Sequence, residues 1–215
     1  HEALEMTGLQ QAVEAGGWVD LHFHKHLTAF YQSEEGEWTV EPDGTLICHG
    51  IDFPRSGFIL KIPLGRDVEM KGEISFDIPE TVNKSHFGSG FGPLIHWLPT
   101  CTDGVRAMIY HLDAHSACTK AYATSSSNST ADISFPLQEW NSFSIRSADG
   151  KFSYDVNGHT MASNHDLAAL GLEDASGFLG FSAYRVPIGT RVRVRNVSVR
   201  KITAAALAPI AATGC

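Results

Sequence analysis

The sequence predicts an all-β fold, a sandwich of two antiparallel sheets that follows a short N-terminal helix. From residue 17 onward, short segments alternate apolar and polar residues, as strands with one buried and one solvated face do. Gly, Asn, Asp and Pro residues separate these segments roughly every 8–14 residues, a spacing typical of sandwiches. The chain has 215 residues, of which 43% are hydrophobic and 19% charged, so it can form one large core.

The chain divides into three parts. Residues 1–16 are rich in helix formers and end in a Gly pair, which predicts an N-terminal helical segment. Residues 17–202 are expected to form the jelly-roll domain. Residues 203–215 form an uncharged, Ala-rich tail, which is either a docking segment or a poorly ordered end.

The expected strands follow one another from residue 17. The first is "GWVDLHFHKHL", and "EWTVEPDGTLICHG" then forms a hairpin with "PDG" as its turn. The hairpin "WNSFSIRSADGKFSYDVNGH" leads into a second turn at Asn157–Gly158, because this pair favours positive φ angles. Ser125–Thr130 is expected to be an exposed loop, and Ser163–Asp174 one short helix N-capped by Ser163 or Asn164. The other expected strands are "SGFILKIPL", "EMKGEISFDIP", "SGFGPLIHWLP", "VRAMIYHLDAH", "KAYATSS", "ADISFPL", "SGFLGFSAY" and "GTRVRVRNVSVRKI".

The last of these strands changes faces. Val192 and Val194 are at even positions, whereas Val197 and Val199 are at odd ones, so the alternation slips between them. The Arg residues at 191, 193 and 195 are expected to pair with acidic residues across a solvated sheet face rather than to bind an acidic polysaccharide.

Charge and hydropathy exclude several partners. A net charge of −8 argues against nucleic acid, and no run of about 20 apolar residues is present to cross a membrane. The chain begins at His1, which fits removal of a signal peptide or a shortened chain, and we expect a secreted or periplasmic protein. Cys101 and Cys118 either close one loop as a disulfide or stay reduced.

One candidate metal site is the row "HFHKH". On a strand, His22, His24 and His26 share one face, and with a fourth ligand they would hold Zn²⁺ or another divalent cation. The alternative is an exposed edge whose imidazoles are solvated. No other cofactor is predicted.

A denser cluster lies in "IHWLPTCTDGVRAMIYHLDAHSACTKAY". On a strand, His111, Asp113 and His115 share one face, and a carboxylate beside an imidazole is what an oriented general base requires. These three are the candidate catalytic residues. In the alternative, Asp113 pairs with Arg106 on an outer face.

A sugar site also needs aromatic platforms and polar side chains that bind hydroxyl groups. Trp38 and Trp140 begin strands and are expected in the core. The candidate substrate-binding residues are His96, Trp97, Arg106, Tyr110, Lys120, Tyr184 and Arg185.

Two motifs near the end of the chain, at Gly177–Gly180 and Val192–Val199, make residues 17–202 resemble the 3-keto-disaccharide hydrolase domain family. The resemblance implies a concanavalin A-like jelly roll that acts on carbohydrates. It also implies a bulge in the last strand, with Arg195 turned toward its neighbours and Asn196 fixing the kink. Asp113 matches the family's Asp, but Gly88 replaces its Asn, and its Glu and Gln fall near Met108 and Tyr110.

Three functions remain open at this point. The first, from the resemblance, is cleavage of a 3-keto-glycoside, in which His111 or His115 takes the C2 proton that the ketone acidifies. The second is a non-catalytic, lectin-like carbohydrate-binding module. The third is a structural or partner-binding sandwich without a sugar site.

Overall fold

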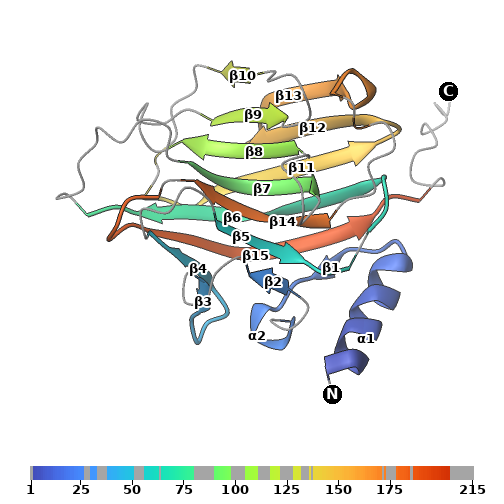
Figure 1. The fold of residues 1–215 in the computed structure, drawn as a ribbon, viewed down its shortest axis with the longest axis horizontal. Coiled ribbons are helices and arrows are strands. Elements are labelled where there is room, and N and C mark those ends of the chain that lie inside the picture. Colours follow the sequence, from blue (N-terminus) through green and yellow to red (C-terminus); the bar gives the residue numbers. More distant parts are fainter. Residues whose placement is uncertain are drawn as a thin grey trace, which may run out of the picture.

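The computed structural model shows the predicted jelly-roll sandwich of two antiparallel sheets, with helix α1 (Glu2–Glu14) at the N-terminus (Figure 1). No helix among the described residues is long and apolar enough to cross a bilayer. The structure describes residues 2–26, 30–32, 38–50, 56–62, 64–79, 90–97, 105–110, 117–121, 128–131, 136, 138–170, 172, 178–184 and 186–203.

The larger sheet, sheet A, is built around the long pair β6 and β15, and β1 pairs with one end of β15. Its strands in spatial order are β13 (His159–Asp166), β12 (Lys151–Val156), β11 (Asn141–Ala148), β6 (Val68–Asp77), β15 (Arg191–Lys201), β4 (Leu46–His49) and β3 (Trp38–Val40), with β1 (Val19–Asp20) beside β15.

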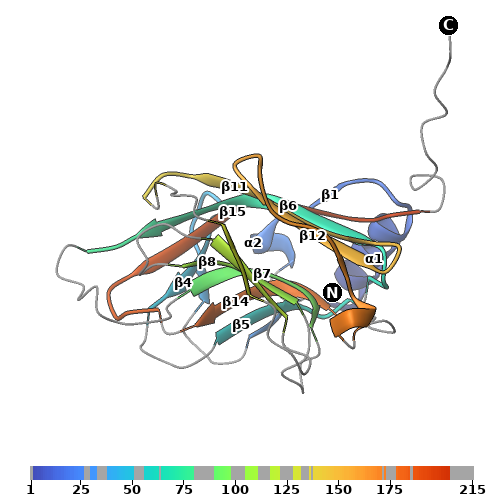
Figure 2. The same cartoon turned by 90° about the horizontal axis from the view of Figure 1, so that it is seen from above.

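The second sheet, sheet B, packs against sheet A, and Figure 2 shows the two layers from their edge. Its strands in spatial order are β10 (Asn128–Ala131), β9 (Ala117–Ala121), β8 (Val105–Tyr110), β7 (Gly90–Trp97), β14 (Phe178–Tyr184), β5 (Ser56–Leu60) and β2 (Phe30–Gln32).

Aromatic side chains from both sheets fill the core. Phe91 and Phe181 stack with their ring centroids 6.0 Å apart, and the Phe143 ring from sheet A meets Phe181 edge-on. Trp38 is buried against Phe58 and Phe91, as the sequence predicts. Each of these buried side chains contributes roughly 1.5–3 kcal/mol of hydrophobic free energy, so this cluster holds the two layers together.

The predicted bulge in β15 is confirmed. The pairing of β15 with β6 shifts register between Arg195 and Ser198, and Asn196 has a φ of +52°. The shift turns valines on both sides of the bulge into the core, where Val194 is 0% and Val197 1% exposed. A strand with one uniform alternation would expose one half of its valines.

The outer face of sheet A carries two of the predicted ion pairs. Arg191 pairs with Asp77, and Arg195 Nε donates to Glu73 Oε2 at 2.8 Å. A further pair, which was not predicted, joins Arg200 to Glu69. The hydrogen bond to Asp77 raises the pKa of Arg191. Arg193 and Arg195 both lie against the ring of Trp140, which is therefore on this outer face rather than in the core.

The prediction that "GWVDLHFHKHL" forms one strand is wrong beyond Asp20. β1 stops at Asp20, and helix α2 (Phe23–His26) follows, in which the N–H groups of Lys25 and His26 both donate to the His22 carbonyl. The reason is the partner strand. Residues after Leu21 would have to pair with β15 at its bulge, where the ladder is interrupted.

Two smaller predictions also need correction. Part of the expected loop Ser125–Thr130 is strand β10, whose Asn128 pairs with Lys120 of β9. In the described part of the expected helix at 163–174, β13 continues to Asp166 and the only helical turn is the 3₁₀ turn η2 (Ala168–Leu170). The Asp166 carboxylate, rather than Ser163 or Asn164, accepts the hydrogen bond from the Ala168 N–H.

A buried polar pair joins the two sheets. The ring of His96 on β7 lies 2.7 Å, Nε2 to Oγ, from Ser147 on β11, and His96 is 1% exposed with a φ of +55°. The pKa of His96 is lowered from 6.5 to about 4, chiefly by burial and secondly by the charge of Arg66, while Asp67 opposes the shift. The folded protein therefore keeps this imidazole neutral.

We expect His96 to make the protein less stable in mild acid. Because the pKa is lower in the folded state, the unfolded chain binds the proton first as pH falls from 6.5 toward 4. This histidine then removes about 2 kcal/mol of stability between pH 7.5 and pH 5. In urea unfolding at both pH values, His96→Asn, which tolerates the left-handed backbone, should lose that part of the pH dependence.

Ser147→Ala is the matched control for this test. It removes the partner of the ring but keeps the ionisable imidazole, so it should destabilise the protein at both pH values and retain the pH dependence. If His96→Asn loses as much stability between pH 7.5 and pH 5 as the wild-type protein, His96 does not titrate as described.

Candidate functional site

One edge of β15 pairs with β6, and along its opposite edge the bulge separates two partner strands. β4 pairs with residues from Arg191 to Val194, and β1 pairs with Ser198 and Val199. In the described part of the chain no strand pairs with this edge between them, and the Val197 carbonyl instead accepts a hydrogen bond from the Leu21 N–H at 2.8 Å. A hollow opens at this interruption.

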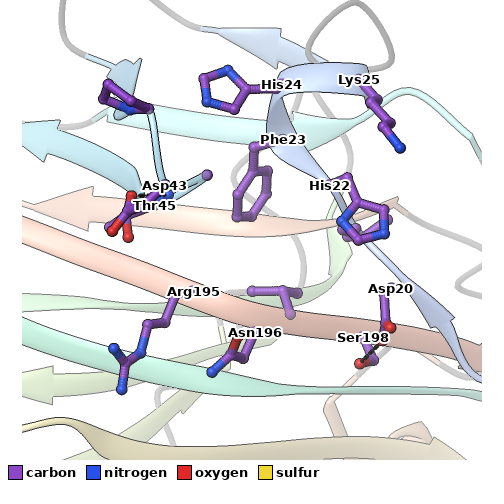
Figure 3. Close-up of a pocket in the computed structure, with 14 residues that line it drawn as sticks. Asp20, His22, Phe23, His24, Lys25, Asp43, Thr45, Arg195, Asn196 and Ser198 are labelled. Carbon is purple, nitrogen blue, oxygen red and sulfur yellow. Dashed lines mark hydrogen bonds between the residues drawn. The ribbon is translucent and has the colours of Figure 1, made fainter.

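The hollow has a volume of about 680 Å³, and we call it the bulge hollow. Three segments line it: residues 20–25, from the end of β1 into α2, the β3–β4 turn at residues 42–45, and the bulge itself at residues 195–198. Figure 3 shows Phe23 in its centre, Asp20 and Ser198 to one side, and Asp43 and Thr45 to the other. The buried side chains of Leu21, Phe23 and Val197 form its apolar part.

Two carboxylates of the bulge hollow are fixed by hydrogen bonds. Asp20 Oδ1 accepts the Ser198 hydroxyl at 2.6 Å, and Asp43 Oδ1 accepts the Thr45 N–H at 2.9 Å. The bonds from Thr45, its N–H first and its side chain second, lower the pKa of Asp43, and Arg193 adds to this effect. The Asp43 carboxyl is therefore ionised at neutral pH.

The bulge residues themselves are held by one acid. Glu73 Oε2 on β6 accepts from Arg195 Nε at 2.8 Å and from Asn196 Nδ2 at 2.6 Å. The guanidinium of Arg195 also lies 3.9 Å from the centroid of the Trp140 ring. This double hydrogen bond orients a guanidinium and a carboxamide at the wall of the hollow.

The three histidines of the predicted metal row do not share one strand face, because α2 replaces the strand. The His22 and His26 rings lie 6.0 Å apart between centroids, and the His22 N–H donates to His26 Nδ1 at 3.2 Å. His24 and Lys25 are exposed on the wall of the bulge hollow. Among the described residues, no three His, Cys, Asp or Glu side chains are placed to hold a metal ion.

The predicted catalytic residues His111, Asp113 and His115 lie outside the described residues, as does Arg185. Their roles stay predictions. Cys101 is also outside the described chain, so the disulfide with Cys118 stays a prediction too.

Five predicted substrate-binding residues are placed by the backbone on sheet B. Arg106 and Lys120 are direct partners on β8 and β9. Tyr110 of β8 and Tyr184 of β14 are both opposite Gly90, so they stand at one level of the sheet, on strands either side of β7. The fifth, Trp97, ends β7, where it is opposite Phe178.

The structure places His96 differently. Its ring points between the two sheets to Ser147, and at 1% exposure it is closed off from a ligand at the surface. It therefore serves the packing of the sandwich in this structure.

The polar groups of the bulge hollow at Asp20, Asp43 and Asn196 were not predicted as site residues from the sequence. Two signals pointed to the place: the "PDG" turn brings Asp43, and the parity slip marks Asn196. What was missing was the register that brings the β3–β4 turn and the bulge together on one edge of β15.

Comparison with known proteins finds no matching family model and no matching curated protein. Solved structures do match. Carbohydrate binding module CBM66 from Bacillus subtilis has a TM-score of 0.60 and 11% identity, covering 80% of this chain and 96% of that chain. The GH43 protein BlXynB from Bacillus licheniformis has a TM-score of 0.57 and 12% identity, covering 79% and 35% of the two chains.

Xylan β-1,4-xylosidase from Bacillus halodurans has a TM-score of 0.55 and 12% identity, covering 80% of this chain and 38% of that chain. At these identities the likenesses show a shared fold. The match covers only 35% of BlXynB and 38% of the xylosidase, so the sandwich corresponds to one part of each of these two chains.

We expect the side chain at position 196 to control the bulge. Asn tolerates a φ of +52°, Gly tolerates it freely, and a β-branched residue does not. Both Asn196→Gly and Asn196→Val lose the bond to Glu73, so their difference isolates backbone strain. In chemical denaturation, Asn196→Val should be less stable than Asn196→Gly by about 1–3 kcal/mol, and equal stabilities would contradict a left-handed residue here.

Proposed function

We propose that this protein binds carbohydrate in the bulge hollow. Carboxylate, carboxamide, guanidinium and imidazole groups form hydrogen bonds with sugar hydroxyls, and all four types line the hollow. The buried side chains of Leu21, Phe23 and Val197 pack beneath these polar groups and form a rigid apolar base for the hollow. The volume of about 680 Å³ lies within the range of roughly 300–1,000 Å³ that is typical of ligand sites.

The observation that carries this proposal is the fixed orientation of the polar groups. Asp20 is held by Ser198, Asp43 by Thr45, and Asn196 by Glu73. A site whose hydrogen-bonding groups are already ordered loses less conformational entropy when it binds a ligand. The groups come from three different segments, so their convergence is a property of the fold rather than of one loop.

The structural neighbours support the same class of ligand. One is named a carbohydrate binding module and another a xylan β-1,4-xylosidase, and both share this fold at low identity.

Cleavage of a 3-keto-glycoside is a finer prediction. It depends on His111 and His115, which lie outside the described residues. Release of the aglycone from an aryl 3-keto-glucoside, lost in His111→Ala or His115→Ala, would make the protein a catalyst as well as a binder. Binding without any turnover would leave the lectin-like function.

The binding proposal is tested with Asn196→Gly, which keeps the bulge and removes the carboxamide. We expect a glycan array to identify bound saccharides and isothermal titration calorimetry to show about a tenfold loss of affinity in the variant, since one hydrogen bond contributes about 1.4 kcal/mol at most.

Asn164→Gly is the matched control, because Asn164 is also exposed and also has a left-handed φ of +51°, but it is on β13, away from the hollow. It should bind like the wild-type protein. Absence of binding to every saccharide on the array, or equal affinities for wild type and Asn196→Gly, would overturn the proposal.

A further inference from the structure

A second, shallower hollow adjoins the bulge hollow on the outer face of sheet A. It has a volume of about 320 Å³, and we call it the sheet groove. Asn196 lines both hollows, so the two meet at the bulge. The polar residues of the sheet groove are Lys71, Glu73, Ser142, Ser144, Asp155, Asn157 and Asn196.

The sheet groove runs across the strands rather than along them. Lys71 of β6 is opposite Ser144 of β11, and Ser144 is opposite Asp155 of β12. On its other side Lys71 is opposite Ser198 of β15, which lines the bulge hollow. Three strand spacings separate β12 from β15, which is roughly 14 Å, and the bulge hollow extends this path to roughly 20 Å.

The groups along the path are close to electrically balanced. The carboxylates are Asp20 and Asp43 in the bulge hollow and Glu73 and Asp155 in the sheet groove. The cations are Lys25 and Arg195 in the bulge hollow and Lys71 in the sheet groove. Glu73 and Arg195 already pair with each other. A ligand with a charge on every unit would bring repeated negative charge against carboxylates or repeated positive charge against cations, which is unfavourable.

Two tryptophans border this surface. The Arg195 guanidinium lies 3.9 Å from the centroid of the Trp140 ring. The Trp18 ring has two cations over it, Lys71 at 4.1 Å and Arg200 at 4.5 Å from its centroid. These cation–π interactions restrict the movement of both rings. Trp18 is 37% exposed, so part of its ring is open to solvent beside the groove.

We propose that the bulge hollow and the sheet groove together bind one linear, uncharged oligosaccharide that lies across the strands of sheet A. This proposal rests on the proposed carbohydrate-binding function. A path of roughly 20 Å suits a tetrasaccharide or a longer chain, and the balanced charge selects neutral sugars over uronic acid or sulfated ones. Asp155 is a binding residue for the units of the chain that lie farthest from the bulge.

The experiment is a chain-length series. Cello-, xylo- and malto-oligosaccharides of two to six units, and oligogalacturonides as the charged counterpart, are titrated calorimetrically into the full chain. We expect affinity for one neutral series to rise at least tenfold from the disaccharide to the tetrasaccharide and then to level off. Oligogalacturonides should bind at least tenfold more weakly than neutral chains of equal length.

Two substitutions locate the ends of the path. Asp155→Ala should lower the affinity for the tetrasaccharide about tenfold and leave the disaccharide affinity unchanged, whereas Asn196→Gly should weaken both. Asp166→Ala is the matched control, because Asp166 is an exposed aspartate on the adjacent strand β13. It accepts one hydrogen bond, from the Ala168 N–H, just as Asp155 accepts one from the Thr160 hydroxyl. Thermal melts confirm that each variant is folded.

The outcomes separate the two proposals. If disaccharides bind as tightly as longer chains, or if Asp155→Ala binds the tetrasaccharide like the wild type while Asn196→Gly does not, the extended site is wrong and carbohydrate binding in the bulge hollow stands. Preference for oligogalacturonides would overturn the neutral class. If no saccharide binds at all, both proposals fail.

Discussion

The left-handed residue at Asn196 lets one long strand contribute to the core along its whole length. Holding a non-glycine residue in this conformation costs about 1–2 kcal/mol. β15 buries four valines, two on each side of the bulge, and without the bulge two of them would face solvent. Burying those two contributes about 3–6 kcal/mol, which exceeds the cost, and the hydrogen bond from Asn196 to Glu73 offsets part of that cost. Burial of the valines therefore stabilises the bulged form of β15.

The same constraint creates the polar surface. β6 pairs with β15 on both sides of the bulge, but along the opposite edge of β15 the partner is β4 before the bulge and β1 after it. Backbone groups at such an interruption still need partners, and the Leu21 N–H meets the Val197 carbonyl. The chain then turns into α2 instead of extending the sheet. Core packing and the bulge hollow are two results of one irregularity.

Much of the fold could be predicted because its signals are local. The Asn157–Gly158 and Asp149–Gly150 turns both adopt the positive φ angles that these residue pairs favour, and the slip in valine parity marked the bulge. Predictions failed where a distant element decided the outcome. The segment from Trp18 to Leu27 alternates like a strand, but its partner ends the pairing at the bulge.

The candidate site was harder to predict than the fold for the same reason. Asp43 and Asn196 are far apart in sequence, and only the pairing of β4 with β15 brings them together. Trp140 looked like a core residue because it begins a strand, yet two arginines on the outer face hold its ring. His96 looked like a surface ligand group, and its pairing with Ser147 across the core is a contact between sheets that sequence spacing does not reveal.

The β3–β4 turn has a consequence for how this scaffold can change. Residues 42–44 are only part of a hairpin tip, and the ladder between β15 and β6 does not involve them. Insertions or exchanges at such a tip are well tolerated in β-sheet proteins because few buried contacts are lost. One wall of the bulge hollow can thus diversify while the valine-rich frame behind it stays constant, an arrangement that lets ligand preference evolve separately from folding.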